Sequence, residues 1–217
     1  MLKKIFILLC FFTVAKAQDS LRYSIDLTKL QNDRLTIEVK LQVGVKEFCF
    51  PKMVPGTYAI YNFGRYVQNL QAYNASGKPI TVIRKDTNCY TFANASSLTY
   101  EVDDTWDSPE IKGPYVFEPA GTNFQQDTPF ALNTHALLGY IKGRDQLPVS
   151  LELKIPTGLV ASSSLEAQAG KYVASSYQKL TDAPILVAAP DTVHLHLANA
   201  EILISVYSPN KKIKASE

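Results

Sequence analysis

The 217-residue sequence carries 22 Lys and Arg against 20 Asp and Glu, a formal net charge of +2, and 46% of its residues are hydrophobic. Three lysines (Lys3, Lys4 and Lys16) and no acidic residue lie in the first 17 positions, which leaves 19 basic against 20 acidic side chains beyond them. This balance excludes a basic stripe of the kind that binds nucleic acid, and the length allows one large β domain or two small ones.

The first 17 residues have the layout of a secretory signal peptide. Lys3 and Lys4 precede an apolar run at residues 5–14, and Ala15-Lys16-Ala17 offers small residues at the cleavage positions. The run is shorter than the about 20 residues that a membrane-spanning helix needs. We therefore predict a signal peptide at residues 1–17, a secreted or periplasmic protein, and no membrane contact after cleavage.

Beyond this leader, apolar residues alternate with a period of two. The alternation is clearest at residues 23–27 and 35–43, on either side of the turn Gln31-Asn32-Asp33, and it predicts two half-buried strands. Further strands are expected at residues 47–50, 66–73, 80–84, 90–92, 98–102, 137–142, 149–155, 172–174, 193–197 and 202–207. Many short strands separated by turns predict an all-β fold, an antiparallel β-sandwich over residues 18–207, with residues 208–217 as the start of a linker.

One segment breaks this rhythm. Residues 103–134, here called the Pro-rich loop, contain Pro109, Pro114, Pro119 and Pro129 with few apolar alternations. A connection of this length in a compact domain is usually functional or contacts something outside the domain. An ordered surface loop is the alternative.

The histidines do not form a zinc-peptidase motif. A catalytic zinc needs three protein ligands and one open position, and none of His135, His194 and His196 lies in a His-Glu-x-x-His sequence. His194 and His196 are two residues apart and share one face of a strand. They form either a weak metal pair in a cryptic metalloenzyme or the outward polar face of a strand whose apolar residues in 193–197 point inward.

Other chemistries also lack their signatures. The sequence has no Gly-x-Ser-x-Gly elbow and no glycine-rich phosphate loop. The acidic run Glu101, Asp103, Asp104 and Asp107 lacks the ligand spacing of a calcium loop and is expected to be a solvated strand end. Cys49 and Cys89 can pair in an oxidising compartment or remain separate buried thiols, and sequence leaves both open.

Aromatic residues gather at Tyr58, Tyr61, Phe63 and Tyr66. Such residues form a domain core or a packing face for another domain. They also suit a platform for sugars or peptides, which keeps a free-standing carbohydrate- or peptide-binding module as an alternative function.

Residues 50–65, Phe-Pro-Lys-Met-Val-Pro-Gly-Thr-Tyr-Ala-Ile-Tyr-Asn-Phe-Gly-Arg, resemble the Pro-Gly-Ser-Tyr…Phe-Ala-Arg motif in the N-terminal domain of the glycyl aminopeptidase family. These are zinc peptidases that often also carry a PDZ domain. The matching positions are Pro55, Gly56, Tyr58, Phe63 and Arg65. Residues 70–80, 140–149, 153–158 and 177–185 resemble later family segments in the same order, so the resemblance covers about residues 20–207. The family usually has tryptophan near the positions of Met53 and Leu159, so local packing is expected to differ.

The resemblance implies a non-catalytic N-terminal β domain that packs on a peptidase catalytic domain and shapes its substrate cleft. The family's zinc-binding domain would begin after about Tyr207, so we expect zinc and catalytic residues in a domain absent from this chain, and no catalytic, metal or cofactor site within it. The expected partners are that peptidase domain and a peptide substrate. In the Pro-rich loop, Glu118 and Asn133 are candidates for contacting a substrate amine or the partner domain.

The motif also has a local physical interpretation. Pro55 fixes φ near −65° and Gly56 tolerates positive φ, so the pair predicts the centre of a type II turn. Tyr58, Ile60 and Phe63 are then expected to pack back on the sheet.

Overall fold

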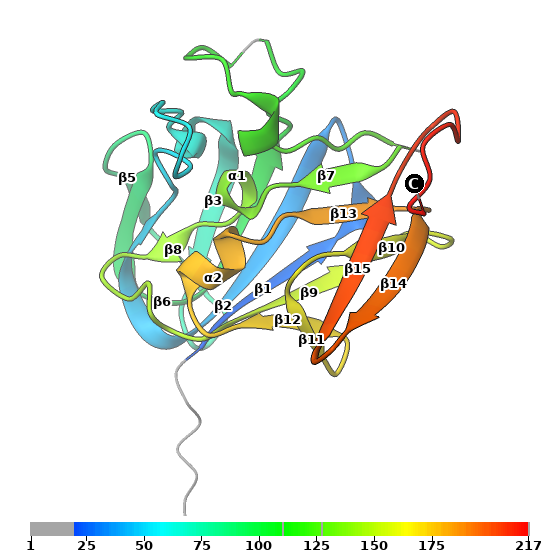
Figure 1. Ribbon diagram of the computed structural model, residues 1–217. Coiled ribbons are helices and arrows are strands. Elements are labelled where there is room, and N and C mark those ends of the chain that lie inside the picture. The colour runs from blue at the N-terminus through cyan, green and yellow to red at the C-terminus, as the bar shows by residue number, and fades with distance from the viewer. Residues whose placement is uncertain (1–19, 110, 127, 217) are drawn as a thin grey trace, which may run out of the picture.

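The computed structural model describes residues 20–109, 111–126 and 128–216, so the predicted signal peptide lies outside the described residues (Figure 1). The fold is mostly β, as the sequence predicts. The strands are β1 (Leu21–Asp26), β2 (Arg34–Cys49), β3 (Val67–Tyr73), β4 (Pro79–Ile80), β5 (Val82–Arg84), β6 (Cys89–Asp103), β7 (Phe130–Leu132), β8 (Tyr140–Ile141), β9 (Val149–Lys154), β10 (Val160–Ser162), β11 (Glu166–Gln168), β12 (Lys171–Ala174), β13 (Ile185–Ala188), β14 (Asp191–Leu197) and β15 (Ala200–Val206). The helical turns are η1 (Leu27–Lys29), η2 (Phe63–Tyr66), η3 (Glu118–Ala120), α1 (Thr134–Leu137) and α2 (Tyr177–Thr181).

Two layers share one core. The large sheet has the order β11-β12-β9-β1-β2-β6-β3-β4, with β5 on β6 and β8 on β2, and a small sheet has the order β10-β13-β7. The small sheet and the short helices lie across one face of the large sheet (Figure 1), and residues of both layers belong to the same buried cluster. Among the strand pairs of the described residues, β1 and β9 alone run parallel. No helix in the described ranges is long and apolar enough to cross a membrane.

Burial confirms the predicted alternation. In β1 and β2 the inward side chains of Tyr23, Ile25, Leu35, Ile37 and Val39 are at most 2% exposed. The intervening residues face outward, which is the period-two pattern of a half-buried strand.

The strand expected at residues 137–142 is only partly correct, because β8 covers two of its residues. This segment holds the end of α1, a bend and the two-residue strand β8. Three buried tyrosine hydroxyls fix the bend, because Tyr23 donates to the carbonyl oxygen of Gly139 at 2.5 Å, Tyr100 to that of Leu137 at 3.1 Å and Tyr177 to that of Leu138 at 2.5 Å. Buried hydroxyls need such partners, so these long-range bonds override the local preference for a strand.

The longest strands, β2 and β6, pair along their whole length and bend together. Their register shifts between Lys40 and Val45 and again before Glu47, and such bulges bend a strand. As a result the two ends of β6 approach one another. Gly64 N donates to Asn88 Oδ1 at 3.1 Å, next to the first residue of β6. Three positions further along the chain, Val67 pairs with Val102, next to the last residue of β6.

Side-chain contacts fix both ends of the β2–β6 pair. At one end Cys49 lies opposite Cys89 and the two form a disulfide, which decides between the alternatives that sequence left open. At the other end Asp103 accepts from Arg34 Nε at 2.5 Å and from Gln68 Nε2 at 2.9 Å.

The expectation of a solvated strand end is therefore correct for Asp107, which is exposed, but wrong for the two carboxylates at the strand end itself. Asp103 and Asp104 are only 4% and 0% exposed. Buried carboxylates need hydrogen-bond donors, and in both cases a neighbouring segment supplies them, as Arg34 and Gln68 do for Asp103.

Removing the disulfide should destabilise the domain. The cross-link joins residues separated by 40 positions, and constraining an unfolded loop of that length contributes about 3–4 kcal/mol. We expect the double variant Cys49→Ala, Cys89→Ala of residues 18–217 to lose stability of that order in urea unfolding. Two titratable thiols in the denatured, unreduced wild type would contradict the pairing.

Candidate functional site

A groove of about 1000 Å³ lies between the small sheet, the Pro-rich loop and the β14–β15 hairpin. It brings together three residues that the sequence singled out separately, Glu118, Asn133 and His194. The other lining residues that matter below are Leu132, Ile185 and Leu186 of the sheet, Trp106 of the loop, and Glu201, Leu203 and Ser205 of the hairpin.

Asp104 holds the Pro-rich loop in shape. Its Oδ1 accepts from Trp106 N and its Oδ2 from Phe124 N, both at 2.6 Å. Thr105 and Thr122 add reciprocal bonds between the same two stretches. Because the Asp104 carboxyl is buried, its pKa is raised to about 6. The loop therefore closes on itself and presents η3 at the groove.

Glu118 is exposed and has a fixed orientation. The hydroxyl of Tyr115 donates to its Oε1, which lowers the pKa of the Glu118 carboxyl. The indole N–H of Trp106 donates to the Glu118 carbonyl oxygen at 3.2 Å. Glu118 thus places a negative charge at the groove, which is also lined by Trp106, a residue that is 42% exposed.

Asn133 joins the loop to the small sheet. It is the N-cap of α1, where its Oδ1 accepts from His135 N at 3.2 Å, and its Nδ2 donates to the Pro119 carbonyl oxygen at 2.9 Å. The Oδ1 atom can still accept one further hydrogen bond, and the Nδ2 group can still donate one. The side chain holds η3 against α1.

The β14–β15 hairpin turns its polar face toward the groove. Strand pairing puts His194, His196, Glu201, Leu203 and Ser205 on one face, and Ser205 Oγ lies 2.8 Å from Ser162 Oγ of β10. The opposite face is mostly apolar. It carries Val193, Leu195, Leu197, Ala200, Ile202, Ile204 and Val206, with Asp191 at its end, and Ile202 also lines the groove.

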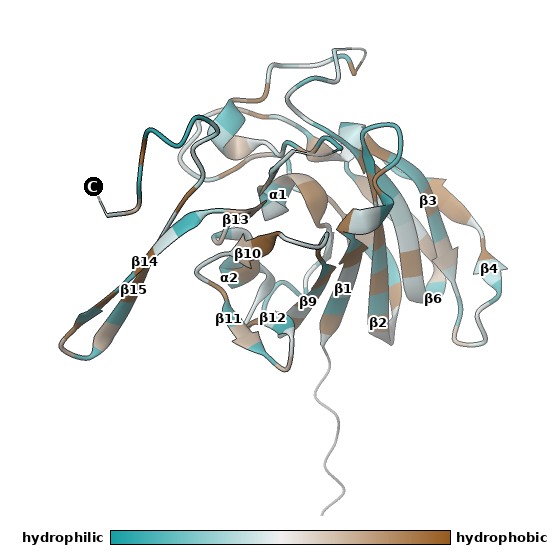
Figure 2. Ribbon diagram, turned by 90° about the vertical axis from the view of Figure 1, so that its right-hand side faces the viewer, coloured by the Kyte–Doolittle hydropathy of each residue, from teal (hydrophilic) through white to brown (hydrophobic). Residues whose placement is uncertain are grey.

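The prediction that the apolar residues of 193–197 point inward is therefore wrong. Leu195 is 41%, Leu197 60% and Ile202 42% exposed. The hairpin projects from the body (Figure 2), so no core lies behind this face. Alternation located the strand correctly, but it does not say which face a core will cover.

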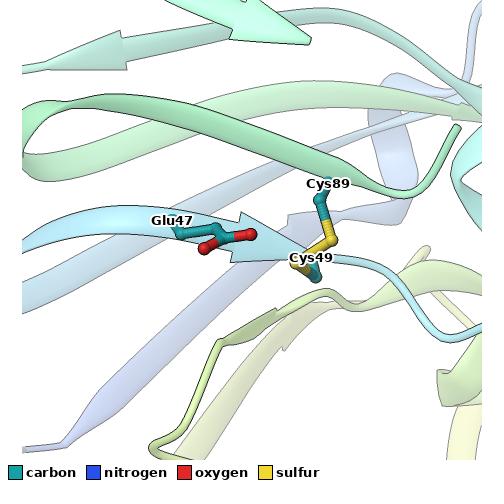
Figure 3. Close-up of side chains that lie close together, drawn as sticks. All are labelled: Glu47, Cys49 and Cys89. Atoms are coloured by element: carbon teal, nitrogen blue, oxygen red, sulfur yellow. A yellow bond between two sulfur atoms is a disulfide. The ribbon is translucent and has the colours of Figure 1, made fainter. Parts of the chain in front are cut away.

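The two histidines share a face as expected, but they belong to no cluster of three potential ligands. His194 Nδ1 lies 3.0 Å from Glu201 Oε1. Within the described ranges the one such cluster is Glu47, Cys49 and Cys89 (Figure 3).

That cluster does not fit a metal. Both of its sulfur atoms are in the disulfide, whereas a metal ligand must be a thiolate. Its carboxylate accepts from Lys85 at 3.1 Å and from Lys142 at 3.2 Å, and these bonds lower the pKa of Glu47.

The motif segment, residues 50–65, combines a confirmed turn with a contact that sequence could not show. Thr57 N donates to the Val54 carbonyl oxygen at 3.3 Å, and Gly56 has φ +86°, as a type II turn centred on Pro55 and Gly56 requires. Arg65 donates to the carbonyl oxygens of Ile111, at 3.3 Å, and Pro114. The arginine of the motif therefore holds the Pro-rich loop.

The expected packing of the motif is only partly correct. Phe63 is fully buried, and Tyr61 and Tyr66 also lie in the core. Tyr58 and Ile60 do not pack back on the sheet, because they are 99% and 58% exposed. The turn at Pro55 carries them out into solvent.

Residues 22–189 match the family model of the Peptidase M61 N-terminal domain. Among solved structures, an aminopeptidase N family protein from Idiomarina loihiensis is similar with a TM-score of 0.71 and 18% identity over 85% of this chain and 32% of that one. A mutant M1 zinc metallopeptidase from Deinococcus radiodurans bound to a Tyr-Ser-Ala substrate has a TM-score of 0.41 and 9% identity over 90% and 50%. No curated protein matches the sequence. The chain thus spans about a third of the first structure's length and half of the second's, and only the first likeness shows a shared fold.

Asp104→Asn should destabilise the Pro-rich loop, because one of two acceptor oxygens becomes a donor facing a backbone N–H. We expect a loss of about 1–3 kcal/mol in the free energy of unfolding. Since the pKa of Asp104 in the folded chain, about 6, exceeds the unfolded value, its contribution is complete below about pH 4 and is lost as pH rises through about 6.

The difference in the free energy of unfolding between wild type and Asp104→Asn should therefore become smaller as pH rises from about 4.5 to about 7.5, measured by urea unfolding. Asp145→Asn is the matched control, because Asp145 is exposed, lies outside the Pro-rich loop and its carboxylate accepts from Gln146 Nε2 at 3.2 Å. If this difference instead grew with rising pH, the folded state would not favour the neutral form of Asp104.

Proposed function

The chain belongs to the Peptidase M61 N-terminal domain family, and from this membership we propose that it is the non-catalytic front domain of a glycyl aminopeptidase-like enzyme. In this proposal it packs on the zinc-binding peptidase domain and shapes the substrate cleft. Residues 18–207 form the domain and residues 208–217 begin the connection to the peptidase domain. The Cys49–Cys89 disulfide supports a secreted or periplasmic location.

The observation that carries the proposal is the outward apolar face of the β14–β15 hairpin. An isolated two-stranded hairpin is at best marginally stable in water, and contiguous exposed apolar surface marks an interaction site. Leu195, Leu197 and Ile202 are exposed by 41%, 60% and 42%. Burial of this face against another domain would stabilise the hairpin.

The comparisons support a peptidase domain as the occupant. The family match ends at residue 189, just before β14. The similar Idiomarina loihiensis protein has this fold in only 32% of its chain, so most of that chain lies outside the shared fold. A domain seated on the apolar face would adjoin the groove, whose polar wall is the other face of the same hairpin.

The groove itself favours a second candidate function, a free-standing peptide- or carbohydrate-binding module. Its volume of about 1000 Å³ is at the upper end of the range for ligand pockets. This function would need no peptidase domain, and the test below separates the two.

The test begins with the DNA beyond the codon for Glu217, where we expect a His-Glu-x-x-His segment in a forward frame. The encoded domain, produced separately, should bind residues 18–217. The triple variant Leu195→Ser, Leu197→Ser, Ile202→Ser should raise the dissociation constant at least about 100-fold, since each anchor contributes about 1 kcal/mol or more.

Ile83→Ser is the matched control, because Ile83 is 61% exposed on β5 and lies outside the hairpin. It should bind as wild type does in analytical ultracentrifugation, with circular dichroism as the check on folding. No His-Glu-x-x-His segment in any frame would move the binding module to first place. Unchanged binding by the triple variant would disprove the docking surface.

A further inference from the structure

We infer that the polar face of the β14–β15 hairpin binds a transition-metal dication such as Zn²⁺, with His194, His196 and Glu201 as its protein ligands. The ion would join the two strands of the hairpin at the edge of the groove. The inference goes beyond the proposed function and does not rest on it, because the binding can be measured on this chain alone.

Strand pairing places the three side chains on one face. His194 and His196 are two residues apart in β14, and the register puts His196 directly opposite Glu201 of β15. Side chains at such opposite positions have Cβ atoms about 4.5–5.5 Å apart. Glu201 also reaches its diagonal neighbour, since its Oε1 lies 3.0 Å from His194 Nδ1. The carboxylate is therefore within reach of both imidazoles.

Two of the ligand atoms are already close to the separation that zinc requires. Tetrahedral ligands that are each about 2.1 Å from zinc lie about 3.4 Å from one another. The distance between His194 Nδ1 and Glu201 Oε1 is 3.0 Å, so a small widening would admit the ion. The metal would take the place of the proton between these two atoms.

The third ligand needs a side-chain rotation. His196 lies outside ligand distance of the other two as the side chains stand. All three residues are exposed, and an exposed side chain can change its rotamer without displacing packed neighbours. The backbone register, which is harder to change, already suits the site.

Two imidazoles and one carboxylate are a donor set for zinc. Imidazole suits Zn²⁺, Cu²⁺ and Ni²⁺, whereas Mg²⁺ and Ca²⁺ take oxygen ligands. Zinc is bound in other proteins by three such protein ligands, with water in the fourth position. The donor set therefore predicts a transition-metal site with one open position.

The charge of the surroundings also favours a cation. His194 and Glu201 line the groove, and Glu118 adds a second carboxylate there. Among the described residues that line the groove, none is lysine or arginine. A dication at this edge would therefore meet a negative potential.

The position of the site gives the metal a structural effect. His196 and Glu201 form the second residue pair from the turn of the hairpin, after Leu197 and Ala200. The hairpin projects from the body (Figure 2), and an isolated two-stranded hairpin is at best marginally stable in water. Metal bonds to both strands would hold the hairpin closed and fix the groove wall that it forms.

The test begins with a calorimetric titration of Zn²⁺ into residues 18–217 produced without an affinity tag. Both cysteines of this span are in the disulfide, so no thiolate competes for the metal. We expect one zinc ion per chain and no saturable binding of Mg²⁺ under the same conditions. Equal affinity for the two ions would show attraction by carboxylates alone and would overturn the inference.

Each of the variants His194→Ala, His196→Ala and Glu201→Gln should weaken zinc binding at least about tenfold, because loss of an outer-shell partner alone costs about 10–100-fold in metal affinity. The matched control Glu166→Gln changes an exposed glutamate on β11, outside the groove, and should bind zinc as wild type does. Circular dichroism checks that each variant folds.

Amide hydrogen exchange gives a second readout, on the hairpin itself. In the wild type, Zn²⁺ should slow exchange at residues 191–206, whereas in His196→Ala it should not. Zinc binding that is unchanged in any of the three ligand variants, or hairpin exchange that is unaffected by bound zinc, overturns the inference.

Discussion

The bend in the paired strands β2 and β6 brings both ends of the pair to the same region of the molecule. Gly64 contacts the residue before β6, and Val67, three positions later, pairs with the end of β6. Three residues span at most about 10 Å, so the two ends of β6 must lie near one another. The disulfide and the Arg34–Asp103 ion pair fix these two ends. Without the bend, the motif segment that leaves β2 and the Pro-rich loop that leaves β6 would start far apart.

Because these ends lie close together, the motif segment can hold the Pro-rich loop in place. Arg65 reaches the carbonyl oxygens of Ile111 and Pro114 because both segments start from the ends of the same bent pair. Asp104 then closes the loop at its base. The loop that carries Glu118 is thus held by Arg65, a residue distant in sequence, so a change at Arg65 would move the groove wall although Arg65 does not line the groove.

Sequence predicted the long strands and missed several elements that are too short to repeat a pattern. The alternation in β1, β2 and β9 is visible because each strand has six or more residues. The three-residue strands β7 and β10 and the four- and five-residue helices α1 and α2 are shorter than the periods that would reveal them.

The groove was predictable only in part. Glu118 and Asn133, which the family resemblance offered as candidates, line the groove. Glu201 and Leu203 could not be predicted, because a period of two is the same whether the apolar face of a strand turns toward a core or away from it. The hairpin's orientation is a tertiary property. An outward apolar face adds no stability to a domain that works alone. In the proposed complex, a second domain docked on this face would stabilise the hairpin on one side and thereby fix the groove wall on the other.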